Sequence, residues 1–399
     1  MLLEKYESVN LFELVPLEHD PVLDELDRLL DEDALFLAVK ADLARRYPHT
    51  LTHGRHSTPV EVILRMLVAK HLYRWSYEQT ESFVADSITL RQFCRVYLNG
   101  VPDDTTLIRW ANLIQPETLH QLLNHVVALA YRLKVTRGRK LRTDGTVVES
   151  NIHYPTDSSL LVDGVRVLSR TLTRARQVVE ATASQAGQAA RDQFRNRWRS
   201  ARNTGRAIGD ATRRGMKETD ARCRQAYQKL VDITQASVRQ AQATVELLHQ
   251  VATKEAAAVA HQVEQFLPLV EEAIQQTVRR VMNEEKVPAQ EKLVSLFEPH
   301  TDIIRRGKAG HPVEFGHKVW LDEVEGGIVS DYRVLDGNPK DDRQWPTSLH
   351  RHQALFGRSP DQASGDRGLY SAANEALAES LGVRRVILPK PGYRSAESL

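Results

Sequence analysis

The stretch VEFGHKVWLDEVEGGIVSDYRVL (residues 313–335) decides the fold class. Apolar and polar side chains alternate along VEFGHKVWLDEV and again along IVSDYRVL, which is the period of a half-buried β-strand. Between them, Glu325-Gly326-Gly327 supplies the flexible positions that a hairpin turn requires. We therefore predict an antiparallel hairpin in this part of the chain.

Shorter elements are predicted on both sides of the hairpin. A basic cluster leads into an extended run at residues 140–144, and Gly145 is expected to turn the chain directly after Asp144. Together these elements predict a mixed α/β sheet that a long helical segment interrupts. After the hairpin we expect a helix around Ser348–Phe356, a strand ending at Asp366, a helix capped by Ser371, and a buried strand in VRRVILP (residues 383–389).

Residues 1–135 have the apolar spacing of helices. Thr58-Pro59-Val60-Glu61 is a capping-box pattern with proline at the first helical position, and a second helix is expected to begin near Asp103. The short helices could form a helix-turn-helix DNA reader or an ordinary bundle with charged outer faces, and the residues alone leave both open. The basic side chains available to such a reader are Arg65, Lys70, Arg74, Arg91, Arg95 and Arg109.

Residues 165–300 predict long helices. The 52 residues between Gly215 and Pro268 contain neither glycine nor proline. An apolar stripe follows a heptad-like spacing there, but Glu255 and Gln262 interrupt it, so a bundle packed within the chain is favoured over a two-stranded coiled coil. The expected domains are a helical N-terminal domain (1–135), two parts of one core (136–164 and 301–399), and a helical insertion (165–300).

Composition limits the protein class. The longest apolar runs fall well short of the roughly 20 residues that span a bilayer, and the first residues lack the basic region of a secretion signal. Only Cys94 and Cys223 are present, far apart, so we expect neither disulfides nor a thiolate metal site, and a cytoplasmic location fits best.

Positive charge is concentrated in two segments, although the net charge is only +2. Residues 132–142 contain six Lys or Arg and no acid, and residues 191–224 contain eleven against four acids. Such clusters are typical of contacts with the phosphates of nucleic acid, but a solvated helix face has the same composition.

Asp144 and Asp366 are each expected at the end of a strand. Two carboxylates on neighbouring strands repel one another unless a cation lies between them, and hard oxygen ligands favour Mg²⁺ or Mn²⁺. Such ions activate a water or a 3′-hydroxyl for phosphoryl displacement, and nearby basic residues would hold the phosphates. An aspartate before glycine is also a common turn residue, which is the alternative for Asp144.

Several stretches together resemble insertion-sequence transposases of the DDE class, in the ISNCY-like group with an RNase H-like core. The resemblance spans most of the chain, and the order and spacing of its motifs make it specific. The matching stretches are TPVEVILRMLVAKHLYRWSYEQTESFVADS (58–87), TDGTVVESNIHYPTDSSLL (143–161), KLVSLFEPHTDIIRRGK (292–308), FGHKVWLDEVEGGIVSDYRVLDGNP (315–339) and ASGDRGLYS (363–371).

The resemblance implies a DNA transposase that cleaves and transfers strands at the terminal inverted repeats of its element. Asp144 and Asp366 would be the first two acids of the catalytic triad and would bind Mg²⁺ or Mn²⁺, and a homodimer on DNA is the expected assembly. His153-Tyr154-Pro155-Thr156-Asp157 looks characteristic of the group, with either an active-site or a folding role. The residues expected to contact DNA are Arg137, Arg139, Lys140, Arg142 and Arg367.

The third acid of the triad departs from the family pattern. In this fold the third acid is a glutamate on a helix after the last core strand. Here Glu397 is the only acidic residue after Leu388. Glu375 and Glu379 belong to the preceding helix and are expected to face solvent. The sequence thus leaves two interpretations: an active transposase, or one with an incomplete triad that only binds DNA. A purely structural coiled-coil protein is a third class, but it leaves both aspartates unexplained.

Overall fold

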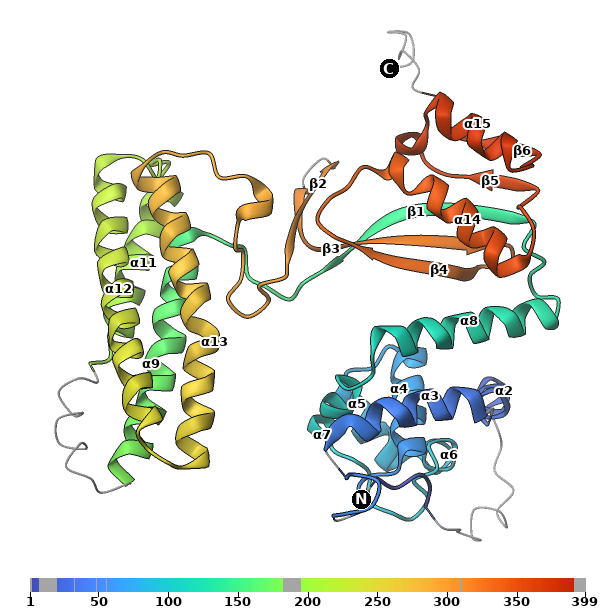
Figure 1. Cartoon of the computed structure of the whole chain (residues 1–399), viewed down its shortest axis with the longest axis horizontal. Helices are drawn as coiled ribbons and strands as arrows, with labels where there is room; N and C mark the ends of the chain where they lie inside the picture. The colour runs from blue at the N-terminus through green and yellow to red at the C-terminus, as the bar shows by residue number, and fades with distance from the viewer. Residues whose placement is uncertain are drawn as a thin grey trace.

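The computed structural model describes residues 2–6, 20–31, 33–47, 49–54, 56–181, 195–308 and 311–390. The chain forms a helical N-terminal part, a mixed sheet with helices on it, and a bundle of long helices that departs after the first strand and returns before the second (Figure 1). The mixed α/β class and the helical segment within it agree with the sequence-based expectation.

Short helices with one shared apolar core make up the N-terminal part. Its core includes Val39, Ile63, Met66, Leu107 and Trp110, all buried. The elements are α2 (Pro21–Leu30), α3 (Asp33–Leu43), η1 (Ala44–Arg46), α4 (Val60–Tyr73), α5 (Tyr77–Asp86), α6 (Ile88–Phe93), α7 (Asp104–Ala111) and α8 (Pro116–Arg132).

Some helices of the N-terminal part begin where the sequence predicted, and others do not. Asp103 caps α7 by accepting a hydrogen bond from the Thr106 amide at 2.6 Å, as the sequence predicted. The capping box at Thr58 was wrong, because α4 begins at Val60 with Pro59 at the N-cap and no side-chain cap. A capping box exists instead at Ser76, whose hydroxyl accepts from Gln79 while the Gln79 side chain accepts from the Ser76 amide.

Arg65 cannot belong to a DNA-reading surface. Its side chain is 1% exposed and forms ion pairs with Asp27 and Asp31 of α2. Arg91 is also occupied, because its guanidinium donates to the carbonyls of Tyr97 and Asn99. These arginines stabilise the helical core, so the list of candidate DNA-binding side chains here becomes shorter.

Six strands form the sheet, in the order β2-β3-β1-β5-β6, with β4 also paired to β3. β2 and β4 each run antiparallel to β3, β3 is antiparallel to β1, and β5 and β6 run parallel to β1. The strands are β1 (Lys140–Glu149), β2 (Asp302–Lys308), β3 (His311–Val324), β4 (Ile328–Leu335), β5 (Gln362–Ser364) and β6 (Arg385–Ile387). The predicted hairpin is confirmed as β3 and β4, with Gly326 and Gly327 at positive φ in the turn.

The first strand is longer than expected. Gly145 does not turn the chain, because β1 continues to Glu149 and stays paired with β3 along its length. Gly145 lies opposite Trp320, and a Cβ atom at Gly145 would approach the indole ring to 3.3 Å. The glycine therefore makes room for a tryptophan of the neighbouring strand.

Helices α14 (Trp345–Phe356) and α15 (Ala372–Ser380) pack on the sheet around Trp320 and Trp345. The Trp320 indole donates to Ser348 at 2.9 Å, and Ser371 caps α15 as predicted. The last strand was expected to be buried and is not: β6 is a short strand at the end of the sheet, and Ile387 is 40% exposed.

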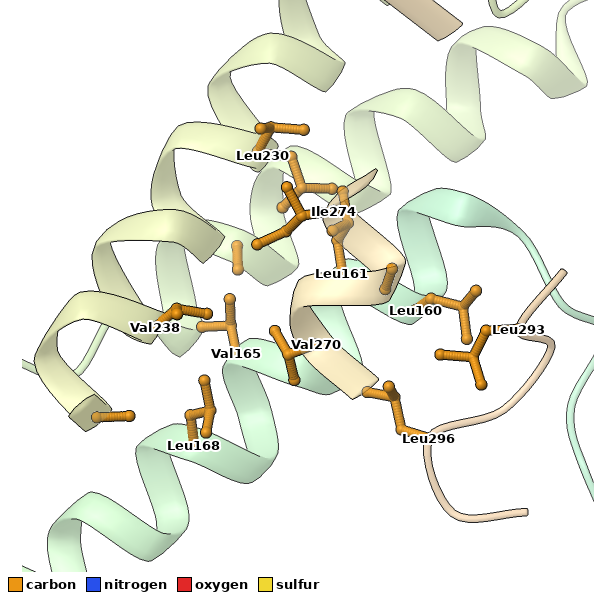
Figure 2. Close-up of a cluster of buried hydrophobic side chains, with 14 of the residues drawn as sticks. Leu160, Leu161, Val165, Leu168, Leu230, Val238, Val270, Ile274, Leu293 and Leu296 are labelled. Carbon is orange, nitrogen blue, oxygen red and sulfur yellow. The ribbon is translucent and has the colours of Figure 1, made fainter. Parts of the chain in front are cut away.

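The bundle consists of α9 (Asp157–Ala181), α11 (Trp198–Arg213), α12 (Ala221–His249) and α13 (Lys254–Thr277), which continues as a π-helical turn, η2 (Val278–Met282). The first helix begins at Asp157, eight residues before the expected start of the helical insertion at residue 165. Leu161, Val165, Leu168, Leu230 and Val270 are among the buried residues that join these helices (Figure 2). The expectation of a bundle packed within the chain is thus confirmed.

Candidate functional site

Asp144 lies in the middle of β1 rather than at its end. Its side chain is exposed, and so are those of Lys140 and Arg142, whereas Leu141 and Thr143 are buried. Because alternate residues of a strand point to opposite faces, Asp144 shares one face of the sheet with the two basic residues. The opposite face is the one that α14 and α15 cover.

Asp366 follows β5, the strand that pairs with β1. The parallel ladder pairs Lys140 with Gln362 and Arg142 with Ser364, where β5 ends, so each aspartate lies two residues beyond the last pair. The chain is still beside β1 just before Asp366, because a Cβ atom at Gly365 would lie 3.4 Å from the Thr143 carbonyl oxygen. Parallel neighbours are about 4.8 Å apart, so the two strands lie side by side at the Arg142–Ser364 pair, and Asp144 and Asp366 each follow two residues later.

Asp366 is oriented by the turn that follows β5. It is the N-cap of a 3₁₀ turn, η5 (Arg367–Leu369), and its carboxylate accepts a hydrogen bond from the Gly368 amide at 3.0 Å. The carboxylate is exposed, which leaves its other oxygen available to a ligand.

Asp341 is a third carboxylate close to this turn, which sequence reasoning missed. A Cβ atom at Gly368 would lie 3.2 Å from an oxygen of Asp366 and 3.6 Å from one of Asp341. Asp341 begins a 3₁₀ turn, η4 (Asp341–Arg343), after β4, and it forms an ion pair with Lys318 of β3. Because that ammonium already neutralises it, Asp341 differs from the two exposed aspartates.

The expected basic residues occupy two different settings. Arg142 is two residues from Asp144 on the same face, and Arg367 directly follows Asp366; both are exposed. Arg137 and Arg139 precede β1, and at about 3.3 Å per residue they lie on the order of 15–25 Å along the chain from Asp144. Arg142 and Arg367 therefore lie close to the two aspartates in the chain. Arg137 and Arg139 lie farther away, on the segment that leads into β1.

The segment before β1 is fixed by Glu325 of the hairpin turn. Its carboxylate accepts hydrogen bonds from the backbone amides of Arg137 at 2.7 Å and of Arg139 and Lys140 at 3.0 Å. Burial raises the pKa of Glu325, but the amides of Lys140, Arg139 and Arg137 together lower it below its usual value. The side chains of Arg137, Arg139 and Lys140 take no part in these hydrogen bonds and are exposed.

A separate acidic pair, Asp322 and Asp331, lies under α14 on the covered face. Both are buried and are opposite one another in β3 and β4. Arg351 binds Asp331 at 2.7 Å, whereas the nearest guanidinium nitrogen of Arg333 is 3.8 Å from Asp322. Burial raises the pKa of Asp322 to about 6.

Two exposed carboxylates and nearby phosphate oxygens are a donor set that suits Mg²⁺, which is commonly held by one or two carboxylates together with substrate phosphates. Among the described residues, no group of three or more His, Cys, Asp or Glu could hold a metal ion. Glu375 lies 3.6 Å from Lys390, Glu379 is exposed, and Glu397 falls outside the described residues. Asp144 and Asp366 are therefore the candidate metal ligands in the described part of the chain.

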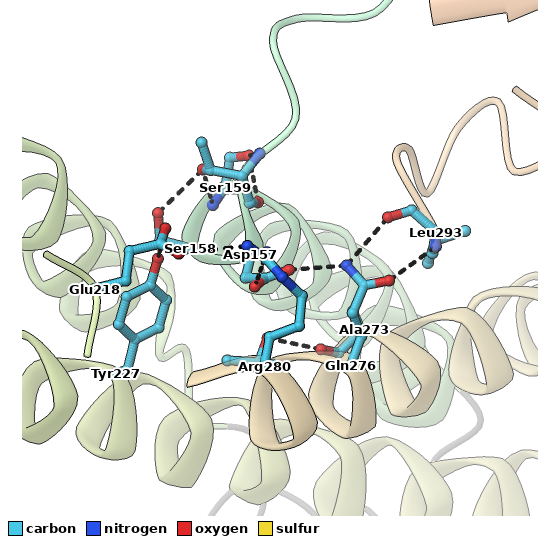
Figure 3. Close-up of polar contacts among 11 residues, drawn as sticks. Asp157, Ser158, Ser159, Glu218, Tyr227, Ala273, Gln276, Arg280 and Leu293 are labelled. Atoms are coloured by element: carbon cyan, nitrogen blue, oxygen red, sulfur yellow. Dashed lines mark hydrogen bonds and ion pairs between the residues drawn. The ribbon is translucent and has the colours of Figure 1, made fainter. Parts of the chain in front are cut away.

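The motif His153-Tyr154-Pro155-Thr156-Asp157 lies where the bundle begins. Asp157 is 1% exposed and accepts from Arg280 and from the Gln276 amide at 2.8 Å (Figure 3). Arg280 also reaches Glu218 at 3.5 Å, and Glu218 accepts from the Tyr227 hydroxyl at 2.9 Å. Burial raises the pKa of Tyr227, with Glu218 adding to the effect. Asp157 therefore joins α9 to η2, which favours a folding role.

Comparison with known proteins identifies the N-terminal part. Residues 9–113 match the family model "Transposase domain (DUF772)", which covers α2 through α7. The match supports a transposase family for this chain. No curated protein and no solved structure gave a match. In the described residues, no helix is both long and apolar enough to cross a membrane.

Proposed function

We propose that this protein is a DDE-type DNA transposase of the ISNCY-like group, and that its sheet is an RNase H-like catalytic core. One observation carries the proposal: the parallel pairing of β1 with β5 reaches Arg142 and Ser364, two residues before Asp144 and Asp366. The transposase-domain match over residues 9–113 supports it independently, because it rests on a different part of the chain.

Asp144 and Asp366 would hold Mg²⁺ or Mn²⁺ through their exposed carboxylates. When bound, such an ion supplies Lewis-acid activation of a water or a 3′-hydroxyl for attack on a DNA phosphate. Arg142 and Arg367 flank the acids and would position the phosphate by charge-assisted hydrogen bonds. Gly368 keeps Asp366 oriented through its backbone amide.

The bundle offers a second surface for DNA. Ala201, Thr204 and Ile208 form the buried side of α11, whereas Arg199, Arg202 and Arg206 lie on its exposed side. Within the described residues, these three arginines have no acidic partner. A row of guanidinium groups without an acidic partner in the described residues, of which Arg202 lies over the Trp198 ring, suits the phosphate backbone of terminal-repeat DNA.

A cleavage assay tests the proposal. The full chain is incubated with Mg²⁺ and labelled duplex carrying the terminal inverted repeats of the element, and nicked product is measured. Asp144→Asn and Asp366→Asn should each reduce cleavage at least 100-fold while leaving affinity for the duplex within about twofold. Asp336→Asn, an exposed aspartate beyond the end of β4, is the matched control and should cleave like the wild type.

The alternative, a protein that binds DNA without cleaving it, predicts binding of the repeats and no nicking by the wild type. Cleavage by the wild type that survives both aspartate substitutions would refute the assigned site. If the duplex is not bound at all, the transposase function itself is wrong.

A further inference from the structure

A cavity of about 230 Å³ lies where the bundle joins the sheet. It is bounded by the start of α9, the end of α13, the segment after it, and the β2–β3 ribbon. Its charged and aromatic lining is Tyr154, Asp157, Arg280, Lys292, Arg305 and Phe315. The cavity includes Tyr154 and Asp157 of the motif whose role the sequence left open.

Positive charge exceeds negative charge in this lining. Asp157 is the only acid among the described residues that line the cavity, and its carboxylate is already occupied by Arg280 and Gln276 (Figure 3). Over the described residues, no acid lies within ion-pair distance of Lys292 or Arg305. In the described part of the chain, Lys292 and Arg305 therefore face the cavity without a direct ion pair, and Asp157 and Glu218 act on Lys292 only from a longer distance.

The pKa of Lys292 also reflects the excess of positive charge in the cavity lining. Burial lowers the pKa of its ammonium, and the neighbouring charges of Arg280 and Arg305 lower it further, against an opposing effect of Asp157. Cations held together in a half-enclosed cavity repel one another, and an anion placed among them relieves that repulsion.

We propose that Lys292, Arg305 and Arg280 form a phosphate-binding site at the junction of the bundle and the sheet. Lysine and arginine are the side chains that bind phosphate oxygens, and here they converge from three segments. The proposed function provides such a group in the phosphodiester backbone of DNA, and in that respect the inference rests on it. Inorganic phosphate shares the same chemistry.

The position of the cations gives the site a mechanical consequence. Arg305 belongs to β2, which pairs with the long hairpin strand β3, whereas Arg280 belongs to η2 at the end of the bundle. A phosphate bound between them would join the bundle to the sheet, so DNA would help to fix the orientation of one on the other.

The test compares the wild type with Lys292→Gln/Arg305→Gln. Lys254→Gln is the control, because Lys254 is an exposed lysine at the other end of α13. In the first arm, inorganic phosphate is titrated into the metal-free protein and followed by ³¹P NMR line broadening. In the second, DNA affinity is measured by fluorescence anisotropy in EDTA over a range of salt concentrations.

In the first arm, the double variant should bind inorganic phosphate at least tenfold more weakly than the wild type. In the second arm, the slope of log DNA affinity against log salt concentration should be smaller by about 0.9, for one lost phosphate contact. Loss in the first arm alone assigns the site to free phosphate, and loss in the second alone to DNA. Equal behaviour of the double variant and the wild type in both arms overturns the site.

Folding and function are separated by further measurements. Circular dichroism checks that the double variant is folded, and Arg305→Gln alone, at an exposed position, repeats the test with little risk to the fold. Lys292→Arg should restore binding. If the wild type binds no DNA, the transposase proposal fails, whereas the phosphate arm still reports on the cavity.

Discussion

The ion pair between Asp157 and Arg280 should be asymmetric in its effect on stability. The Asp157 side chain is 1% exposed, whereas that of Arg280 is 30% exposed and also reaches Glu218. Arg280→Gln leaves a buried carboxylate with only Gln276 as a donor, so we expect a cost of about 3 kcal/mol, at the lower end of the range for broken buried pairs. Asp157→Asn leaves a cation that water can still reach, and we expect about 1.4 kcal/mol.

Hydrogen–deuterium exchange of peptides from α9 and α13 measures both effects. At about 1.4 kcal/mol per factor of ten, protection should fall on the order of 100-fold in Arg280→Gln and about tenfold in Asp157→Asn. Arg279→Gln is the matched control. Arg279 is next to Arg280 in the sequence, but its side chain pairs with Glu285 and Glu291 at the surface, so protection should hardly change. Equal losses in the two variants, or a larger loss in Asp157→Asn, would refute the reasoning.

Two pH-dependent effects are expected in the sheet. Glu325→Gln should lower the free energy of unfolding by about 1 kcal/mol at pH 7, because the lowered pKa of Glu325 stabilises the fold only while the carboxylate is charged. The difference between variant and wild type should shrink as the pH falls below the usual glutamate value of 4.5, and a difference that stays constant through that range would contradict this. Asp322 gives the opposite dependence of stability on pH. Its pKa is raised from 3.8 to about 6, so the free energy of unfolding falls as the pH rises between those values. At about 1.4 kcal/mol per pH unit this amounts to about 3 kcal/mol, and Asp322→Asn should remove it; denaturant titrations from pH 4 to 8 that give parallel curves for variant and wild type would exclude the effect.

Much of the sheet could be predicted because its signals are local. Alternation along β3 and β4 and the two glycines between them require no knowledge of distant residues. The length of β1 could not be predicted in this way. Gly145 has the composition of a turn, but the space its missing side chain leaves is filled by Trp320, which is 175 residues later in the sequence.

The buried arginine of the N-terminal part illustrates the same limit. Arg65 sits among apolar residues in α4, and its partners Asp27 and Asp31 belong to another helix. Only the packing of α2 against α4 decides whether that guanidinium faces solvent or an acid. For the same reason the sequence could not show that β5 pairs in parallel with β1, or that this pairing ends two residues before Asp144 and Asp366.

Asp144 and Tyr154, which lines the cavity of the proposed phosphate site, lie on one continuous segment of the chain. Asp144 is ten residues before Tyr154, so at about 3.3 Å per residue the two are at most about 33 Å apart. One turn of DNA rises about 34–36 Å, so a single duplex could contact both places within one turn. A phosphate at the bundle junction would then help to position the DNA on which Asp144 and Asp366 are proposed to act, which would give a physical reason for attaching the bundle directly after β1.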